Sequence, residues 1–256
     1  MKKPIIAAQL FTVRDLLNGK SEEEIRDVLT KISEIGYTAI QISGVGEITS
    51  ELADIYMNIA ADLNLDICAT HFSLEFIEAN TELVIETHKK WKCEYCGIGI
   101  IPDEFKSNDK LDEFISRMNI LGEKLKKEGI WLIYHNHKLE FQKVNGQPWL
   151  QYFLDNFNSE YIELELDTYW IQAGGANPVT WINKVSERMG VMHLKDMRIV
   201  DNEQQFAEIG NGNLEWINIL EAANNAKVKY AAVEQDRFTE DPIESLRVSY
   251  NYLESL

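Results

Sequence analysis

Short apolar runs alternate with longer segments of helical period eight times along this chain. The runs are rich in β-branched and aromatic residues, and the segments between them repeat apolar residues every three or four positions. Strands that alternate with helices of this length form parallel βαβ units. Eight units within 256 residues match the roughly 250 residues that a (β/α)8 barrel usually needs. We therefore predict an α/β fold in which residues 1–256 form one domain, a single (β/α)8 TIM barrel.

The expected strands and helices can be located along the sequence. The first strand covers residues 5–13, and the other seven fall in AIQIS, DICATH, YCGIGII, IWLIYHNH, YIELELD, GVMHLKD and KYAAVEQD. The expected helices cover residues 21–36, 50–63, 81–91, 111–128, 148–156, 179–188, 214–225 and those from 242 onward. A long loop is expected before residue 214. The alternative is an open doubly wound sheet, but the glycine-rich sequence that binds dinucleotides in such sheets is missing after the first strand.

Composition excludes several classes of protein. The formal net charge is −17, and a surface of this charge repels phosphate backbones, so we expect no nucleic-acid partner. No segment reaches the roughly 18 apolar residues of a membrane span, and the N-terminus lacks a signal-peptide cleavage pattern, so we expect a cytoplasmic protein with no membrane partner. The three cysteines are too few for a disulfide framework, and the CxxC of Cys93 and Cys96 is a weak signal for metal or redox chemistry.

Ionisable side chains collect at the ends of the expected strands. Because the carboxyl ends of parallel barrel strands open on one face, residues far apart in sequence should meet there. Four of the five histidines belong to this group, and the fifth, His88, lies in the expected helix 81–91, where we predict a solvent-exposed position. The strand-end residues are His71, His135, His137, Asp167, His193, Lys195, Asp196, Glu234 and Asp236.

The residue types in this group favour a metal or catalytic site. Histidine with aspartate and glutamate, and without thiolate, suits Mn, Zn, Co, Fe or Mg, so we predict one divalent metal ion as cofactor. Residues two apart on a strand share a face, which on the sixth strand places Glu163 and Glu165 on the face of Asp167. A barrel interior does not hold unpaired carboxylates, so these two glutamates require polar partners or a bulge in the strand.

Eight short sequences resemble those of the xylose isomerase-like barrel superfamily. They are AAQLFTVRD, GYTAIQISG, CATHFSLE, YHNHKLEF, LDTYW, HLKDM, IGNGNLEW and VEQD, and they extend over nearly the whole chain. That superfamily contains sugar phosphate isomerases and epimerases, inosose dehydratases and relatives of the apurinic endonucleases. The resemblance implies a (β/α)8 barrel with one metal ion held by residues from strands five to eight.

Carried over by position, the resemblance gives His135, Asp167, His193 and Glu234 as metal ligands. The family most often has a glutamate at the strand-five position, where this chain has His135. In the epimerases, two glutamates from strands five and eight act as a paired acid and base, so the pair is incomplete here. Glu140, in the loop after the fifth strand, is a candidate for the missing carboxylate.

The predicted function is a metal-dependent isomerase or epimerase that acts on a small sugar or sugar-like ketone through an enediolate. A bound metal polarises the ketone and makes the neighbouring C–H more acidic. We predict Glu234 as the base, His135 or His137 as its catalytic partner, and Lys195 as the group that stabilises the oxyanion. The candidate substrate-binding residues are His71, Gln41, Trp170, Glu208, Asp236 and Arg237, with Phe11 as part of an apolar wall.

Two other classes of function stay open. A lyase, such as a dehydratase of an inositol-derived ketone, uses the same scaffold, and the replacement of a glutamate by His135 favours it. A hydrolytic nuclease relative or a non-catalytic binding barrel is the third class, and the net charge of −17 argues against the nuclease. No phosphate-binding sequence is evident, so a sugar, a cyclitol and a sugar phosphate are all candidate substrates. The oligomeric state is open, and a homo-oligomer is compatible with the sequence.

Overall fold

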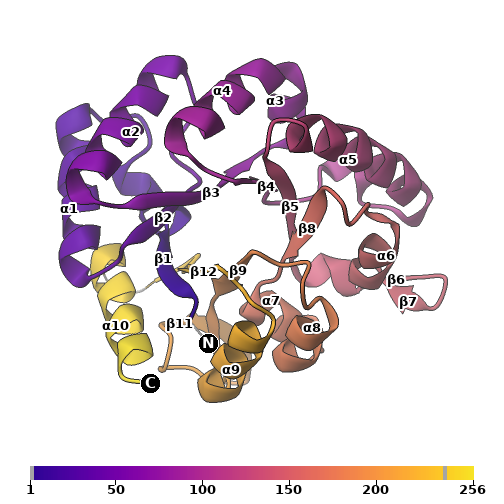
Figure 1. The fold of residues 1–256 in the computed structure, drawn as a ribbon. Helices are drawn as coiled ribbons and strands as arrows, with labels where there is room; N and C mark the ends of the chain where they lie inside the picture. Colours follow the sequence, from indigo (N-terminus) through magenta and orange to yellow (C-terminus); the bar gives the residue numbers. More distant parts are fainter. Residues whose placement is uncertain (1–2, 239–240) are drawn as a thin grey trace.

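The structure is a computed structural model that describes residues 3–238 and 241–256. Eight parallel strands form a nearly closed barrel that helices surround (Figure 1), so the predicted single (β/α)8 TIM barrel is confirmed. Around the barrel the strands follow the order β8, β5, β4, β3, β2, β1, β12 and β9. Their bounds are β1 Ile5–Gln9, β2 Ala39–Ile42, β3 Asp66–Phe72, β4 Tyr95–Ile98, β5 Trp131–His135, β8 Ile162–Glu165, β9 Val191–Leu194 and β12 Tyr230–Val233.

The barrel closes between β8 and β9 through a few backbone contacts. The amide of Leu164 donates to the carbonyl of Arg188 at 2.9 Å, and the amide of His193 donates to the carbonyl of Leu166 at 2.8 Å. Asp167 and His193 then form an isolated parallel bridge just beyond the strands. Closure of the barrel therefore places two of the predicted metal ligands side by side.

The helices of the outer layer begin and end close to where the sequence signals place them. Ser21 and Glu24 form a capping box at the start of α1, and Gly36, with a φ of 123°, follows its last residue. The helix bounds are α1 Glu22–Ile35, α2 Ser50–Leu63, α3 Leu74–Ala79, α4 Thr81–Trp91, α5 Leu111–Lys126, α6 Trp149–Asn156, α7 Thr168–Ala173, α8 Pro178–Lys184, α9 Trp216–Asn225 and α10 Pro242–Glu254. Two helices that the sequence does not predict, α3 and α7, have only six residues each.

The first strand is shorter than the predicted residues 5–13. It ends at Gln9, whose side-chain oxygen accepts a hydrogen bond from the Phe11 amide at 3.2 Å. A 3-10 helix, Leu10–Leu16, follows instead of more strand. This turn brings the Phe11 side chain over the end of the barrel, where it lines a cavity described below.

The predicted long loop before residue 214 contains an antiparallel hairpin. Its strands are β10 Asp196–Val200 and β11 Glu203–Ala207. Asp201 and Asn202 connect them, and both have positive φ values, as a tight two-residue hairpin turn requires. A second, smaller hairpin, β6 Lys143–Val144 with β7 Gln147–Pro148, lies in the connection after β5.

The barrel interior changes character along its axis. At its amino-terminal end it is filled by small side chains such as Ala7, Ala39, Ala69 and Ala232, all fully buried. At its carboxyl end the buried residues are polar and ionisable, so the candidate site lies at that end. Within residues 3–238 and 241–256, no helix combines the length and apolarity needed to cross a membrane.

The prediction that His88 is exposed is wrong. Its side chain is 1% exposed and packs between α4 and the barrel, because its two ring nitrogens have polar partners there. Nε2 lies 3.1 Å from the hydroxyl of Thr70, and Nδ1 lies 3.1 Å from the carbonyl of Cys93. Burial lowers the pKa of His88 to about 4, so the folded protein holds this histidine neutral.

Acid should therefore destabilise the protein through His88. Below pH 6.5 the unfolded chain protonates this histidine, whereas the folded chain does so only near pH 4, so stability is lost as the pH falls through this window. The expected loss is about 3 kcal/mol of unfolding free energy. Urea unfolding of wild type and His88→Gln at pH 7 and pH 4.5 tests this. The variant should lose less stability than wild type between the two pH values, and an equal loss would contradict the assignment.

Candidate active site

A cavity of about 300 Å³ opens at the carboxyl ends of the barrel strands. A volume of this size suits a small polar molecule. All four residues predicted to be catalytic line it, together with His71 and Asp236. The lining residues are Phe11, Ser43, His71, Phe72, Ser73, Gly99, Ile100, His135, His137, Lys195, Glu234 and Asp236.

The four predicted metal ligands lie together beside this cavity. His135, Asp167, His193 and Glu234 are all buried, and one ligand atom from each lies within 4.8 Å of the others. Nδ1 of His193 is 3.0 Å from Oε2 of Glu234 and 3.8 Å from Oδ2 of Asp167. Four nitrogen and oxygen ligands at this separation are a donor set that a divalent metal ion can bind.

The hydrogen-bonding state of buried polar atoms also indicates that these residues can bind a metal ion. Among the described residues, Nδ1 of His135 is buried without a hydrogen-bond partner, and Oδ2 of Asp167 has no hydrogen bond but forms an ion pair with Nζ of Lys195 at 3.2 Å. Leaving such groups unsatisfied costs about 1–3 kcal/mol each. The other oxygen of Asp167 is already used, since Oδ1 caps α7 by accepting from the Trp170 amide at 2.9 Å. The residues present therefore fit a divalent metal ion.

Lys195 contributes a fixed positive charge to the site. Its ammonium nitrogen lies 2.6 Å from Oε2 of Glu234, 3.2 Å from Oδ2 of Asp167 and 3.0 Å from Oδ2 of Asp236. Burial alone lowers the pKa of Lys195, but these carboxylates, Asp167 and Glu234 first, raise it well above its usual value. The lysine is 1% exposed, so a permanent cation is buried among three carboxylates.

The histidines of the site differ in their expected charge. Burial, followed by the neighbouring histidines, holds the pKa of His135 well below its usual range, and burial lowers the pKa of His137 to about 3. Burial alone lowers the pKa of His193, but Glu165 and Glu234 raise it to about 10. His135 is therefore neutral, as a metal ligand must be, whereas metal binding to His193 has to displace a proton.

Glu165 was not among the predicted site residues, although it lies at the centre of the group. It is fully buried, and Oε1 accepts a hydrogen bond from Nε2 of Gln41 at 2.8 Å and lies 3.3 Å from Nε2 of His193. Oε2 forms a short contact with Nε2 of His71. Burial raises the pKa of Glu165, but His193 and His71 outweigh it and hold this pKa well below its usual value. The spacing of Glu165 and Asp167 on one strand face was the available signal.

The polar partners that the sixth strand requires are present for both glutamates. Glu163 lies at the opposite end of the barrel, where Oε2 accepts a hydrogen bond from the Gly190 amide at 2.6 Å. Burial raises the pKa of Glu163. Glu163 therefore does not belong to the site, whereas Glu165 does.

The predicted substrate-binding residues divide into those at the cavity and those elsewhere. His71 and Asp236 line it, whereas Gln41 is buried beneath it and bridges Glu165 and His193. Trp170 is not part of the lining, although its ring lies 5.0 Å from that of His137.

Glu208 and Arg237 are not brought to this cavity. They line a separate hollow of about 340 Å³ beside β11, together with Gln235. Glu208 accepts a hydrogen bond from the hydroxyl of Ser245 at 3.2 Å, and Arg237 is exposed to solvent. In this structure neither residue contacts the metal-ligand group.

Glu140 is not among the residues that line the cavity. The hydroxyl of Tyr134 donates to Oε1 of Glu140 at 2.6 Å, and the amide of His137 donates to Oε2 at 2.8 Å. Burial raises the pKa of Glu140 to about 7. In this arrangement Glu140 holds the chain after β5 in place, and it does not occupy the position of the missing strand-five carboxylate.

Asp196 organises the loop that follows the hairpin. Its carboxylate accepts hydrogen bonds from the amides of Gly210, Gly212 and Leu214 at 3.0–3.2 Å and from Nε1 of Trp216 at 2.7 Å. A Cβ at Gly212 would lie only 2.2 Å from this carboxylate, so the close approach requires glycine. The sequence IGNGNLEW thus serves loop geometry.

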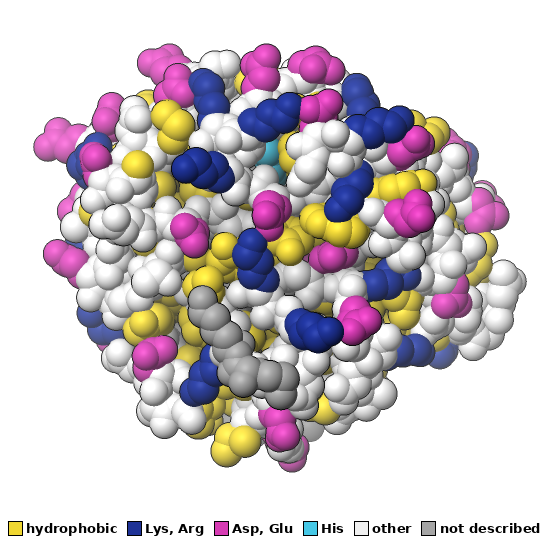
Figure 2. Space-filling view, in the orientation of Figure 1, with side chains coloured by type: hydrophobic (Ala, Val, Ile, Leu, Met, Phe, Trp, Pro, Cys, Tyr) yellow, Lys and Arg dark blue, Asp and Glu magenta, His cyan; other side chains and the backbone are white. Residues whose placement is uncertain are grey.

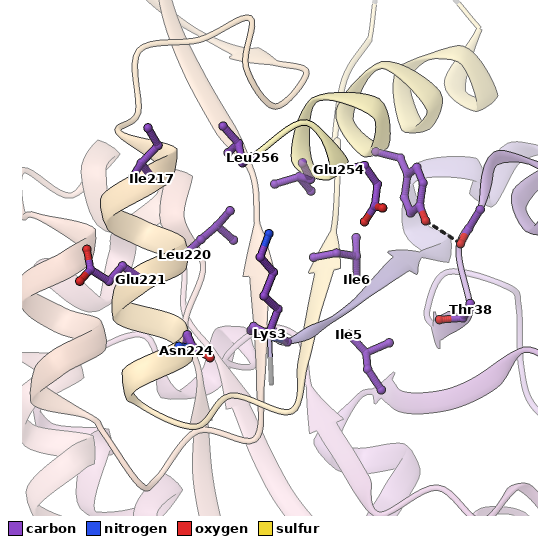
Figure 3. A pocket seen from close by; sticks show the side chains of 14 residues that line it. Lys3, Ile5, Ile6, Thr38, Ile217, Leu220, Glu221, Asn224, Glu254 and Leu256 are labelled. Atoms are coloured by element: carbon purple, nitrogen blue, oxygen red, sulfur yellow. Dashed lines mark hydrogen bonds between the residues drawn. The ribbon is translucent and has the colours of Figure 1, made fainter. Parts of the chain in front are cut away.

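A further cavity of about 410 Å³ lies outside the barrel, between β1, α9 and α10 (Figure 3). The hydroxyl of Tyr250 donates to the carbonyl of Gly36 at 2.8 Å at its edge. The charged side chains that line it are those of Lys3, Glu221 and Glu254, and no histidine lines it. It therefore offers no ligand group like that at the carboxyl ends of the strands.

Comparison with known proteins agrees with this fold. The model of the family described as xylose isomerase-like TIM barrel matches residues 29–255. This chain belongs to the xylose isomerase-like TIM barrel family. Enzymes with a (β/α)8 barrel have their active sites at the carboxyl ends of the strands. No curated protein matches the chain significantly in sequence.

Solved structures similar to this xylose isomerase-like barrel cover nearly all of it. A sugar phosphate isomerase/epimerase from Parabacteroides distasonis has a TM-score of 0.81 at 21% identity, over 100% of this chain and 95% of the other. A probable 3-DHS dehydratase from Bacillus anthracis has a TM-score of 0.76 at 16% identity, over 99% of each chain. A barrel protein from Mycobacterium smegmatis in complex with magnesium has a TM-score of 0.78 at 13% identity, over 99% and 96%. At such identities the similarity shows the fold alone.

Proposed function

We propose that this chain is a metal-dependent isomerase or epimerase of a small sugar or sugar-like ketone, acting through an enediolate. The observation that carries the proposal is the pairing of Glu234 and Lys195 at the cavity wall, with 2.6 Å between Oε2 and Nζ. A carboxylate beside a fixed cation suits removal of a proton next to a carbonyl, because the base and the stabiliser of the oxyanion act on neighbouring atoms. The adjacent group of potential metal ligands supports the same chemistry.

The residues take distinct roles in this proposal. His135, Asp167, His193 and Glu234 hold the metal ion, which when bound supplies the Lewis acidity that polarises the carbonyl and its neighbouring hydroxyl. Glu234 takes the proton from the carbon beside the carbonyl. Lys195 stabilises the negative charge that develops on the substrate oxygen, since its ammonium group is held in place before the reaction begins.

The second proton transfer requires a group on another side of the cavity. His135 ends β5 and His137 follows it, and both line the cavity. The strands β9 and β8 separate β5 from β12, which Glu234 follows. Both histidines are held neutral by burial, so either can accept the proton of the substrate hydroxyl, and the imidazolium that forms can then donate that proton to carbon. Return of the proton to the opposite face of the same carbon gives the epimer, and return to the neighbouring carbon gives the isomer.

A lyase is the second candidate for the same site. The specific observation in its favour is His135, a neutral imidazole at the position where the paired mechanism uses a second carboxylate. A neutral imidazole at the cavity wall can accept a proton from a substrate hydroxyl, and the imidazolium that forms can donate it to a departing hydroxyl group. The resulting reaction is loss of water from the carbon beyond the enediolate, for example from an inositol-derived ketone.

A small molecule is the partner that we propose for this site. Acidic and basic side chains are interspersed over the face drawn in Figure 2, and the whole chain has a net charge of −17, so an extended nucleic-acid backbone is a poor match. A cytoplasmic location and a homo-oligomeric state remain predictions from the sequence. Sugars, cyclitols and their phosphates are equally compatible with the proposed chemistry.

A substrate screen in deuterated water tests the reaction. Purified protein is supplied with Mn²⁺, Zn²⁺ or Mg²⁺ and with ketoses, ketose phosphates and inososes, and the products are followed by NMR and mass spectrometry. We expect deuterium at the carbon next to the carbonyl, with no water lost. Loss of water would favour the lyase instead. If no compound in the set shows deuterium exchange or product formation, both the isomerase or epimerase proposal and the lyase proposal are contradicted.

A further inference from the structure

The hollow beside β11 is a second place on the molecule where a small ligand can bind. Its volume is about 340 Å³, and residues of the β10–β11 hairpin and of the chain after β12 line it. We propose that this hairpin hollow binds a small hydroxylated dianion, either a phosphate monoester or a hydroxy dicarboxylate. The inference does not rest on the proposed reaction, because binding is measured without turnover. The residues that carry it are Arg198, Gln205, Glu208, Gln235 and Arg237.

The charged side chains of the hairpin hollow are mainly basic. Arg198 comes from β10 and Arg237 follows β12, and Glu208 contributes one carboxylate. Neither arginine forms an ion pair with another residue that the structure describes. On a chain with a net charge of −17, two guanidinium groups in one hollow make a local basic site. Their two positive charges match an anion that carries two negative charges.

Arg198 has a buried nitrogen that lacks an acceptor. Its Nε has no hydrogen-bond partner among the described residues. Its Nη2 lies 3.5 Å from Oε1 of Gln205, which stands opposite Arg198 in the hairpin. A guanidinium presents its nitrogens as a planar fork that fits two oxygens of a phosphate or carboxylate group. An oxyanion in the hairpin hollow would therefore give the fork of Arg198 the acceptors that the protein does not supply.

Gln235 contributes a buried amide to the same hollow. Its side chain is 4% exposed, and Oε1 has no hydrogen-bond partner in the described part of the chain. A buried amide oxygen without a partner is unfavourable, and a ligand hydroxyl that donates to it removes this penalty. The carboxylate of Glu208 is a further acceptor for hydroxyl groups. The ligand that fits this hollow therefore has hydroxyl groups beside its anionic group.

The backbone on both sides of the hairpin hollow is held in place. The amide of Asn213 donates to the carbonyl of Met197 at 2.7 Å, and its Oδ1 accepts from the Ile199 amide at 3.2 Å. Across the hollow, the amide of Gln235 donates to the hydroxyl of Thr12 at 3.0 Å. The lining residues therefore start from fixed positions, so less conformational freedom is lost when a ligand binds.

The hairpin hollow is separate from the candidate active site. The two cavities share no lining residue that the structure describes. After β12, Glu234 and Asp236 line the candidate active site. Gln235 and Arg237 line the hairpin hollow instead, and this alternation is that of an extended chain. A dianion in the hollow therefore occupies a different space from a substrate that Glu234 deprotonates.

Isothermal titration calorimetry of the whole chain with glycerol 3-phosphate, malate and glycerol tests the proposal. We expect at least one of the two dianions to bind wild type with a Kd on the order of 1 mM at low salt, and glycerol not to bind measurably. Arg198→Gln should weaken binding by about tenfold or more, because it removes a charge and the fork. Arg237→Gln should weaken it by about threefold, since Arg237 is exposed to solvent. The dianion that binds more tightly identifies the anionic group that the hollow prefers.

Two further variants are the matched controls. Arg247→Gln removes an arginine that pairs with Glu244 on α10, outside the hairpin hollow. Glu234→Gln changes the candidate active site and leaves the hollow intact. Both variants should keep the Kd of the dianion within about twofold of wild type.

The outcomes distinguish the hairpin hollow from other binding places. Failure of both dianions to bind at concentrations up to about 20 mM would overturn the proposal, and so would glycerol binding as tight as that of the dianions. A Kd that both Arg198→Gln and Arg237→Gln leave unchanged would overturn it as well. In that case a weaker affinity in Glu234→Gln would place the dianion in the candidate active site. If Arg198→Gln does not fold, Arg237→Gln decides the result, because its side chain is exposed to solvent.

Discussion

Replacing Glu234 with glutamine is expected to lower the rate of substrate proton exchange with solvent by about a thousandfold. The amide cannot take the proton, and it is also a weaker metal ligand than the carboxylate. The rate is measured as deuterium incorporation into whichever ketone the screen identifies, at saturating metal concentration. The proton is removed by Glu234 in our proposal, so this variant affects the chemical step directly.

Glu163→Gln is the matched control for this experiment. Glu163 is a partly buried glutamate of the same barrel, but it lies at the opposite end and hydrogen-bonds the Gly190 amide. Its replacement should leave the exchange rate within about twofold of wild type. An exchange rate in folded, metal-loaded Glu234→Gln equal to that of wild type would show that another group is the base.

Replacing Lys195 with methionine is expected to destabilise the metal-free protein by about 3–5 kcal/mol. The ammonium group lies within 3.2 Å of carboxylate oxygens from Asp167, Glu234 and Asp236, and the first two of these residues are buried. Without the lysine these negative charges, two of them on buried side chains, repel one another. A divalent ion bound by Asp167 and Glu234 restores a counter-charge, so added metal should stabilise the variant more than it stabilises wild type.

Thermal unfolding with and without Mn²⁺ or Zn²⁺ measures this difference. Lys229→Met serves as the control, because Lys229 is solvent-exposed and forms a surface ion pair with Glu94. Its unfolding free energy should change by no more than about 0.5 kcal/mol. The electrostatic explanation would be wrong if metal stabilised Lys195→Met no more than wild type.

The barrel could be predicted from the sequence because local signals and the overall fold agree. Ser21 caps α1 as expected, and the bounds of α2 and α4 are those predicted. The sequence patterns did not predict the local structure at positions where one polar side chain determines it. Gln9 ends β1 by binding the Phe11 amide, and Asp167 caps the six-residue α7, which is too short to show a helical period.

The candidate site could be predicted in part. The strand-end rule brought His135, Asp167, His193 and Glu234 together, because parallel strands expose the same end on one face. The same rule could not exclude Glu208 from the predicted site, because the side chain of a loop residue has no fixed direction relative to the strands. Those loop positions depend on the hairpin of β10 and β11, which was not anticipated.

Residues inside the barrel were harder to place. Glu165 was recognised as a buried carboxylate in need of partners, but the partners come from other strands, and their register is not visible in one sequence. His88 was assigned to the surface because charged neighbours surround it in α4. Its burial follows from contacts with Thr70 and Cys93, which lie outside the helix.

Diffraction from metal-soaked crystals, recorded at the absorption edge of Zn or Mn, tests the central claim most directly. We predict an anomalous peak about 2.0–2.2 Å from ligand atoms of Asp167, His193 and Glu234, and its loss in Asp167→Asn. A peak at His71, His135 and Glu165 alone would move the metal away from the proposed base. Absence of any peak beside Asp167 and Glu234 in wild type at saturating metal would contradict a metal-dependent enzyme at this site.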